Sequence, residues 1–339
     1  MQDAALPVLD ISTFDGSPNS PFVTQLRDAA HGPGFCYLEG HGIPTHLETQ
    51  LIGDARAFFH RPQAERHAIA IGNSPHFRGY TILGDEVTAG ARDWREQIDI
   101  GPEEPALMLN ATDPAWLRLR GPNQWPEQVP QLRVSVTNWL DQMEQLATTI
   151  MRALALGLGQ SASYFDPVIS PDPYPRVKVI RYPAQPDGGG SPQGLGLHHD
   201  SGFLSFILQD GVGGLQVKSG DRLIDAQPRK GAYIMNLGEM LQVATNGYLK
   251  ATPHRVQSPP SGQERISIAY FFNPRLDAVI NPVPLPPELA AHAPGGQNAE
   301  PTDPVYRTFG DNTLKIRMRA HPDVTSRFYA DVVLPPASG

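Results

Sequence analysis

The chain contains very little cysteine: Cys36 is the only one among 339 residues. A single cysteine excludes an intramolecular disulfide and a metal site built from several thiolates. Because disulfide-free chains are typical of reducing compartments, we predict a cytoplasmic location. The first seven residues, MQDAALP, lack the basic and apolar regions of a secretory signal peptide.

Long apolar runs and basic clusters are also missing. No stretch approaches the roughly 20 apolar residues that span a bilayer, so we expect no membrane association. The formal net charge is −8, and no basic run is interleaved with aromatic residues, so we expect no nucleic-acid partner. The hydrophobic content of 40% is enough for a substantial core, and 35 prolines favour turns and sheet edges over a helical bundle.

The spacing of apolar residues changes along the chain. Helical periodicity predicts helices over 22–31, 44–60 and 131–158, while 72–104 contains few clear elements. After Pro175 the period becomes two, and short apolar runs alternate with turns, which suggests a jelly roll or barrel. These runs cover 177–182, 203–208, 215–217, 232–236 and 266–272.

We therefore predict one compact domain of mixed α and β structure with three regions. Residues 1–170 form a mixed, largely helical region packed on the core, and 171–280 form the core itself. Residues 281–339 hold a proline-rich loop over 281–304, a candidate lid, followed by C-terminal helices that Pro322 interrupts.

A pattern of two histidines and one aspartate is the strongest chemical signal. His198 and Asp200 are two residues apart, so on a strand both would face the same side, and His254 follows after several predicted strands. Two imidazoles and one carboxylate suit a non-haem Fe(II) centre that keeps open positions for O2 and a second ligand. A zinc hydrolase uses the same residue types, and His-x-Asp also occurs by chance, so the pattern alone leaves these alternatives open.

A second pattern begins eleven residues after His254. Arg265 and Ser267 are also spaced by two, so on a strand a cation and a hydroxyl share one face. Such a pair is suited to binding a carboxylate beside a metal. The two patterns together predict an enzyme that binds iron and an anionic co-substrate.

The residues around both patterns resemble the isopenicillin N synthase-like family of Fe(II)/2-oxoglutarate-dependent oxygenases. The similar segments run in family order: LPVLD (6–10), GFCYL (34–38), HGI (41–43), GLGLHHDSGFLS (194–205), GGLQV (213–217), NLGE (236–239), HRV (254–256) and RIS (265–267). The resemblance implies a double-stranded β-helix, or jelly roll, flanked by helices. It departs from the family at Ile180, where asparagine is common, and at Ser205, where threonine is usual.

The resemblance also implies roles for particular residues. His198, Asp200 and His254 would hold Fe(II), while Arg265, Ser267 and Tyr182 would bind the distal carboxylate of 2-oxoglutarate. With O2 as the other co-substrate, the expected activity is oxidation of an unactivated C–H bond of a small molecule, by hydroxylation, desaturation or cyclisation. We expect a monomer or weak homodimer in secondary or amino-acid-related metabolism.

Two alternatives remain within this resemblance. Isopenicillin N synthase and the aminocyclopropane-carboxylate oxidases keep the Arg-x-Ser pair without using 2-oxoglutarate, and a non-catalytic jelly-roll metal binder would retain only the fold. A segment resembling bacterial members, and in part the bacterial ethylene-forming enzyme, suggests candidate substrate contacts. These are Glu86, Thr88, Lys178, Arg319 and Phe272.

Overall fold

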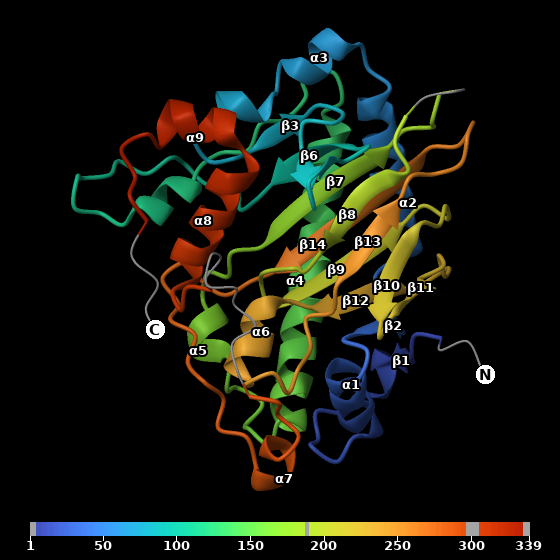
Figure 1. Ribbon diagram of the computed structural model, residues 1–339, viewed down its shortest axis with the longest axis vertical. Coiled ribbons are helices and arrows are strands. Elements are labelled where there is room, and N and C mark those ends of the chain that lie inside the picture. Colours follow the sequence, from blue (N-terminus) through green and yellow to red (C-terminus); the bar gives the residue numbers. More distant parts are fainter. Residues whose placement is uncertain (1–4, 187–189, 296–304, 335–339) are drawn as a thin grey trace.

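Two β-sheets face each other at the centre of the computed structural model, which describes residues 5–186, 190–295 and 305–334 (Figure 1). The larger sheet has eight strands in the order β1-β2-β12-β9-β14-β7-β6-β3. All its neighbours are antiparallel except β1 and β2. Its strands are β1 (Val8–Asp10), β2 (Phe35–Glu39), β3 (Gly79–Thr81), β6 (Glu96–Ile100), β7 (Arg176–Tyr182), β9 (Leu204–Gln209), β12 (Tyr233–Leu237) and β14 (Arg265–Phe272).

The smaller sheet has four antiparallel strands in the order β11-β10-β13-β8. Its strands are β8 (Gln193–His198), β10 (Leu215–Ser219), β11 (Arg222–Asp225) and β13 (His254–Gln257). A short hairpin of β4 (Val87–Thr88) and β5 (Ala91–Arg92) packs against β8. An apolar cluster fills the space between the two sheets, and among its members are Leu195, Ile207, Leu215, Ile234 and Val256.

Helices cover the opposite face of the larger sheet (Figure 1). The long helix α4 packs against α1, α2 and β14, and its buried residues recur every three or four positions, as the sequence predicts. No helix among the described residues has the length and apolar character needed to cross a membrane. The helices are α1 (Pro21–His31), α2 (Thr45–Phe59), α3 (Gln63–His67), α4 (Gln131–Gly157), α5 (Asp166–Ile169), α6 (Glu239–Ala244), α7 (Pro287–Ala290), α8 (Phe309–Ala320) and α9 (Pro322–Phe328).

The alternation of side chains along β14 separates the two faces of the larger sheet. Ile266, Ile268, Tyr270 and Phe272 belong to the core under the helices, whereas Ala269 belongs to the cluster between the sheets. Phe272, a predicted substrate contact, therefore faces the helices, and the structure does not bring it to the inner face that carries Arg265 and Ser267. Its neighbour in sequence, Phe271, lies on the inner face and packs against the cluster between the sheets.

The segment 72–104 contains more structure than its sequence suggests. It supplies β3 and β6 to the larger sheet as well as the β4–β5 hairpin. The signal is hidden because β6 is fully buried yet carries three polar side chains, Glu96, Gln97 and Asp99, so the usual apolar alternation is absent. Part of the predicted loop over 281–304 lies outside the described residues, and the division at 170 and 280 stays a prediction.

Candidate metal centre

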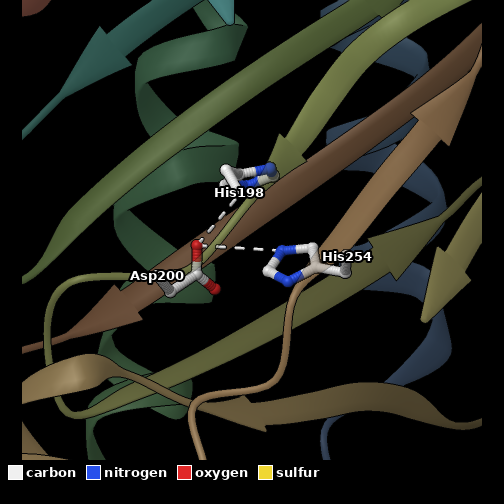
Figure 2. Close-up of side chains that lie close together, drawn as sticks. All are labelled: His198, Asp200 and His254. Atoms are coloured by element: carbon white, nitrogen blue, oxygen red, sulfur yellow. Dashed lines mark ion pairs between the residues drawn. The ribbon is translucent and has the colours of Figure 1, made fainter. Parts of the chain in front are cut away.

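Three side chains converge at the mouth of the two sheets. One ligand atom from each of His198, Asp200 and His254 lies within 4.8 Å of the others (Figure 2). His198 is the last residue of β8 and His254 the first of β13, and the two are register partners on neighbouring strands. The spacing of His198 and Asp200 predicts that both lie on one strand, but only His198 does. Strand β8 ends at His198, and Asp200 lies in the turn that follows.

Hydrogen bonds orient both imidazoles toward the carboxylate. His198 Nδ1 lies 2.9 Å from the Gly196 carbonyl oxygen, and His254 Nδ1 lies 3.1 Å from that of Thr252. Since a carbonyl only accepts, each Nδ1 must carry the proton, which leaves each Nε2 lone pair free. The Nε2 atoms lie 3.8 Å and 3.9 Å from Asp200 Oδ1, so three donor atoms of suitable type face one point.

The protonation states also suit a divalent cation. Burial and the neighbouring His254 lower the pKa of His198 to about 3, so its imidazole is neutral near pH 7. Burial alone would raise the pKa of Asp200, but the two histidines, Asn236 and Ser205 lower it below its ordinary value. The site therefore presents two imidazole nitrogens and one carboxylate oxygen, which is the donor set that Fe(II) accepts with positions left open.

The turn that carries Asp200 is held by the segment 236–239. Asn236 Nδ2 donates to Asp200 Oδ2 over 2.7 Å, which leaves Oδ1 for a metal. The Glu239 amide donates to the Asp200 carbonyl over 2.7 Å, and a Cβ at Gly238 would lie 2.2 Å from the Gly202 carbonyl oxygen. Sequence reasoning treated this segment only as part of a resemblance and did not identify Asn236 as the partner that orients the aspartate.

Arg265, Ser267 and Tyr182 form a second group on the inner face of the larger sheet. Arg265 is the register partner of Tyr182, and its guanidinium carbon lies 4.9 Å from the tyrosine ring centre. Arg265 is 1% exposed and donates through Nη2 to Gln209 (2.9 Å) and through Nε to the Val212 carbonyl (3.1 Å). Its buried Nη1 has no hydrogen-bond partner in the described structure, so the arginine retains a donor for a ligand.

Two predicted substrate residues, Glu86 and Lys178, meet in a buried polar network. Glu86 Oε1 lies 3.4 Å from Lys178 Nζ, and Glu86 Oε2 accepts from Arg95 over 2.6 Å. Thr88 lies nearby in the β4–β5 hairpin, where its hydroxyl donates to Asp93 over 2.7 Å. The structure thus joins these three predicted residues through one set of polar contacts.

Arg319, the remaining predicted substrate residue, lies elsewhere. It is exposed on α8, whereas Arg317, two positions earlier, is buried and pairs with Asp99 over 2.9 Å. Residues two apart on a helix point in nearly opposite directions, so only one of these arginines can face the sheets. Arg317 is the arginine that the structure brings to the polar network, and it does not bring Arg319 there.

The fold and the site together define a class of protein. Two facing sheets bring two histidines and an aspartate to one point, with a buried arginine on the inner face, and this is the donor set of a mononuclear non-haem iron centre with open coordination positions. Such a centre is suited to the activation of O2.

Comparison with known proteins agrees with this class. Residues 6–128 match the family described as non-haem dioxygenase in morphine synthesis N-terminal, and residues 174–274 match the 2OG-Fe(II) oxygenase superfamily. The chain is 32% identical to the 2-oxoglutarate-dependent dioxygenase frbJ of Dothideomycetidae sp. (strain 11243), covering 96% of this chain and 92% of that protein. It is also 32% identical to Homoarginine-6-hydroxylase 2-ODD-233 of Oryza sativa subsp. japonica, covering 82% and 88%.

Solved structures share the fold. JOX2 in complex with 2OG, Fe and JA has a TM-score of 0.71 and 28% identity, covering 92% of this chain and 85% of that one. The dioxygenase for auxin oxidation in rice has a TM-score of 0.65 and 25% identity, covering 93% and 95%.

The chain therefore belongs to the 2OG-Fe(II) oxygenase superfamily. It is an Fe(II)- and 2-oxoglutarate-dependent dioxygenase with a jelly-roll core, and the predicted fold class, enzyme class and cofactors are confirmed.

Proposed function

We propose that His198, Asp200 and His254 hold Fe(II), and that Arg265, Ser267 and Tyr182 bind the distal carboxylate of 2-oxoglutarate. The enzyme would then oxidise an unactivated C–H bond of a small molecule by hydroxylation, desaturation or cyclisation. The observation that carries the proposal is the buried, unpartnered Nη1 of Arg265, which lies on the same inner face as Ser267. A buried arginine donor is costly unless an anion binds it, and 2-oxoglutarate supplies that anion.

When bound, Fe(II), 2-oxoglutarate and O2 together supply the oxidising power, and 2-oxoglutarate leaves as succinate and CO2. The protein's residues contribute by holding the metal and the co-substrate in fixed positions. His198, Asp200 and His254 would hold the metal through three ligands and would leave its remaining positions open. Asn236 fixes which aspartate oxygen faces the metal.

The co-substrate end of the site is fixed in the same way. Gln209 and the Val212 carbonyl hold the guanidinium of Arg265 in one orientation, and the ring of Tyr182 lies against it. The apolar cluster between the sheets lies beside this end and excludes water around the carboxylate. A carboxylate that binds Nη1 of Arg265 and the hydroxyl of Ser267 would therefore be held in one orientation.

The test is an anaerobic titration of the purified protein. Fe(II) is added first and 2-oxoglutarate second, and the visible charge-transfer band of the iron chelate is recorded. We expect a saturable band in the wild type and, in Arg265→Gln, a 2-oxoglutarate affinity about ten- to hundredfold lower, since a charged hydrogen bond contributes roughly 1.5–3 kcal/mol. A folded, iron-loaded protein that gives no band contradicts the proposal.

We further propose that the enzyme acts in the cytoplasm as a monomer or weak homodimer, in secondary or amino-acid-related metabolism, and binds neither nucleic acid nor membranes. The net charge of −8 and the single cysteine support this proposal. Size-exclusion chromatography with light scattering tests the oligomeric state. A stable higher oligomer contradicts that part.

A further inference from the structure

A network of buried charged groups lies on the inner face of the larger sheet, beyond the arginine–serine pair. It joins residues from β6, β7, α8 and the segment around the β4–β5 hairpin. The network consists of three carboxylates, four cations and one amide, namely Glu86, Asp93, Asp99, Arg95, Arg176, Lys178, Arg317 and Gln97. We refer to it as the charged network.

All three of its carboxylates are already surrounded by donors. Glu86, the first, contacts Arg95 (2.6 Å), Lys178 (3.4 Å) and Gln97 Nε2 (3.2 Å). Although burial alone would raise the pKa of Glu86, Lys178 and Arg95 lower it to about 2. This carboxylate is ionised and satisfied, so a ligand cation would have to displace a cation that the protein already supplies.

Asp99 and the third carboxylate are occupied in the same way. Asp99 contacts Arg317 (2.9 Å), Arg176 (3.4 Å) and Gln97 (2.7 Å). Asp93 accepts from Thr88 (2.7 Å) and from the Gly196 amide (3.0 Å), and Arg95 lies 3.5 Å from it.

Positive charge is in excess, and two of the four cations are the most exposed charged side chains of the network. Four cations face three carboxylates, and the side chains of Arg176 and Lys178 are 14% and 13% exposed, against 3% for Asp99. Burial lowers the pKa of Lys178, and burial together with Arg317 lowers the pKa of Arg176 to about 10. Both directions indicate cations that lack full compensation by anions.

The network is connected to the metal centre. Arg95 contacts Asp93, Asp93 accepts the Gly196 amide, and the Gly196 carbonyl orients His198. Along β7, Lys178 lies four residues from Tyr182, which is about 13 Å on the same face. The charged network therefore contacts the strand that carries His198 and lies further along β7 from the proposed 2-oxoglutarate clamp.

Resting on the proposed function, we propose that the substrate is a small carboxylate whose charged group binds Lys178 and Arg176, and that it is not a cation. A carboxylate would balance the fourth cation and accept hydrogen bonds from a guanidinium and an ammonium. A guanidinium or ammonium substrate would instead add positive charge to a buried site that is already net positive, which is costly in a medium of low dielectric constant.

Three flat molecules of the same shape and different charge test this inference: benzoate, benzamide and benzamidinium. Acetate, acetamide and acetamidinium form a smaller set. Each is titrated calorimetrically into the anaerobic Fe(II) protein with saturating 2-oxoglutarate, which occupies the Arg265 site. We expect at least one carboxylate to bind about tenfold more tightly than its amide, with no binding of the amidinium, since one charged hydrogen bond contributes on the order of that factor.

Variants locate the binding. Lys178→Met removes one cation while Arg95 still contacts Glu86, and we expect carboxylate affinity to fall about tenfold with an unchanged 2-oxoglutarate titration. Lys178→Arg keeps the charge and should retain the preference. Arg152→Gln, which removes a half-exposed arginine on α4, serves as the matched control and should change neither titration.

The outcomes separate the two proposals. No chelate band in a folded, iron-loaded wild type overturns the proposed function and this inference with it. A normal chelate band overturns this inference alone if the amide or amidinium binds as tightly as the carboxylate, or if no carboxylate of either set binds. Carboxylate affinity that is unchanged in Lys178→Met also overturns it, because the probe is then bound elsewhere.

Discussion

The two ends of one sheet face hold their cations in different ways. At the Tyr182 end of β7, Arg265 is bound only by neutral acceptors, and among the described residues no carboxylate lies within ion-pair distance of it. At the Arg176 end, the cations contact Glu86 and Asp99. The first end therefore has no direct ion pair to its arginine, whereas the carboxylates of the second balance three of its four cations.

This difference suggests how the protein distinguishes 2-oxoglutarate from the proposed carboxylate substrate. A buried arginine without an ion-pair partner is unfavourable until an anion binds it. Such an arginine suits a co-substrate that is required in every turnover. A network that is largely self-compensated keeps its structure without ligand and gains a smaller amount from binding. Neither group contains one of the three converging ligands, so substitutions at the metal should leave the charged network intact, and substitutions in the network should leave the chelate intact.

The largest effect is expected at the metal itself. Asp200→Ala removes the only carboxylate of the three converging groups, and we expect iron-dependent succinate formation to become undetectable. Circular dichroism should still show a cooperative thermal transition, because the charged network is untouched. The control is His199→Ala at the exposed neighbouring position, which should keep turnover. Turnover retained in Asp200→Ala would contradict the ligand assignment.

A smaller loss is expected when the orientation of that carboxylate is relaxed. Asn236→Ala removes the donor to Asp200 Oδ2, and metal affinity should fall about ten- to hundredfold, the usual effect of losing a hydrogen bond to a metal ligand. Mn(II) binding followed by electron paramagnetic resonance measures this without turnover. Asn110→Ala, at an exposed asparagine, is the matched control. Equal Mn(II) affinities in Asn236→Ala and the wild type would show that the hydrogen bond does not orient the ligand.

The sequence predicted the metal end better than the charged end, for a physical reason. Metal ligands are few, of distinctive type and regularly spaced, and β14 displays Arg265 and Ser267 on one face by simple alternation. The long helix α4 and the strands β7, β9, β12 and β14 were likewise visible as apolar periodicities. These features depend on local spacing, which a single sequence contains.

The charged network depends on contacts between distant segments. Gln97 and Asp99 lie on a strand without apolar alternation, and Arg317 reaches Asp99 from a helix far along the chain. Residue spacing gave no sign that α8 turns Arg317 rather than Arg319 inward, nor that Asn236 would meet Asp200. Such pairings are set by tertiary packing, which overrides local pattern.

The charged end should respond to pH through His321, which is 3% exposed and lies 3.8 Å from Glu86. Burial and the nearby Arg317 lower its pKa to about 3, although Glu86 and Asp99 act in the opposite direction. Because the unfolded chain binds the proton near pH 6.5 and the folded chain does not, stability should fall as pH drops from 6.5 toward 3. The contribution is about 2 kcal/mol between pH 7 and pH 5.

His321→Gln should remove that part of the pH dependence. Urea unfolding of the metal-free protein at pH 7 and pH 5 measures it, and the exposed His46→Gln is the matched control. If His321→Gln and the wild type lose the same unfolding free energy between the two pH values, the folded protein protonates His321 as readily as the unfolded chain.

The smallest expected effect concerns Thr88, for which the resemblance and the geometry suggest different roles. Its hydroxyl donates to Asp93, and a Cβ at Gly196 would lie 2.8 Å from its carbonyl oxygen, so the residue braces the hairpin against β8. Thr88→Val should lower the free energy of unfolding by about 1 kcal/mol, the contribution of one hydrogen bond, because Gln193 and Gly196 still donate to Asp93. Thr88→Ser keeps the hydroxyl and is the control.

The chelate titration and the benzoate affinity of Thr88→Val should both stay unchanged. If stability is instead unaltered while benzoate binding weakens, Thr88 contacts the substrate directly, and the hairpin belongs to the binding site rather than to its support.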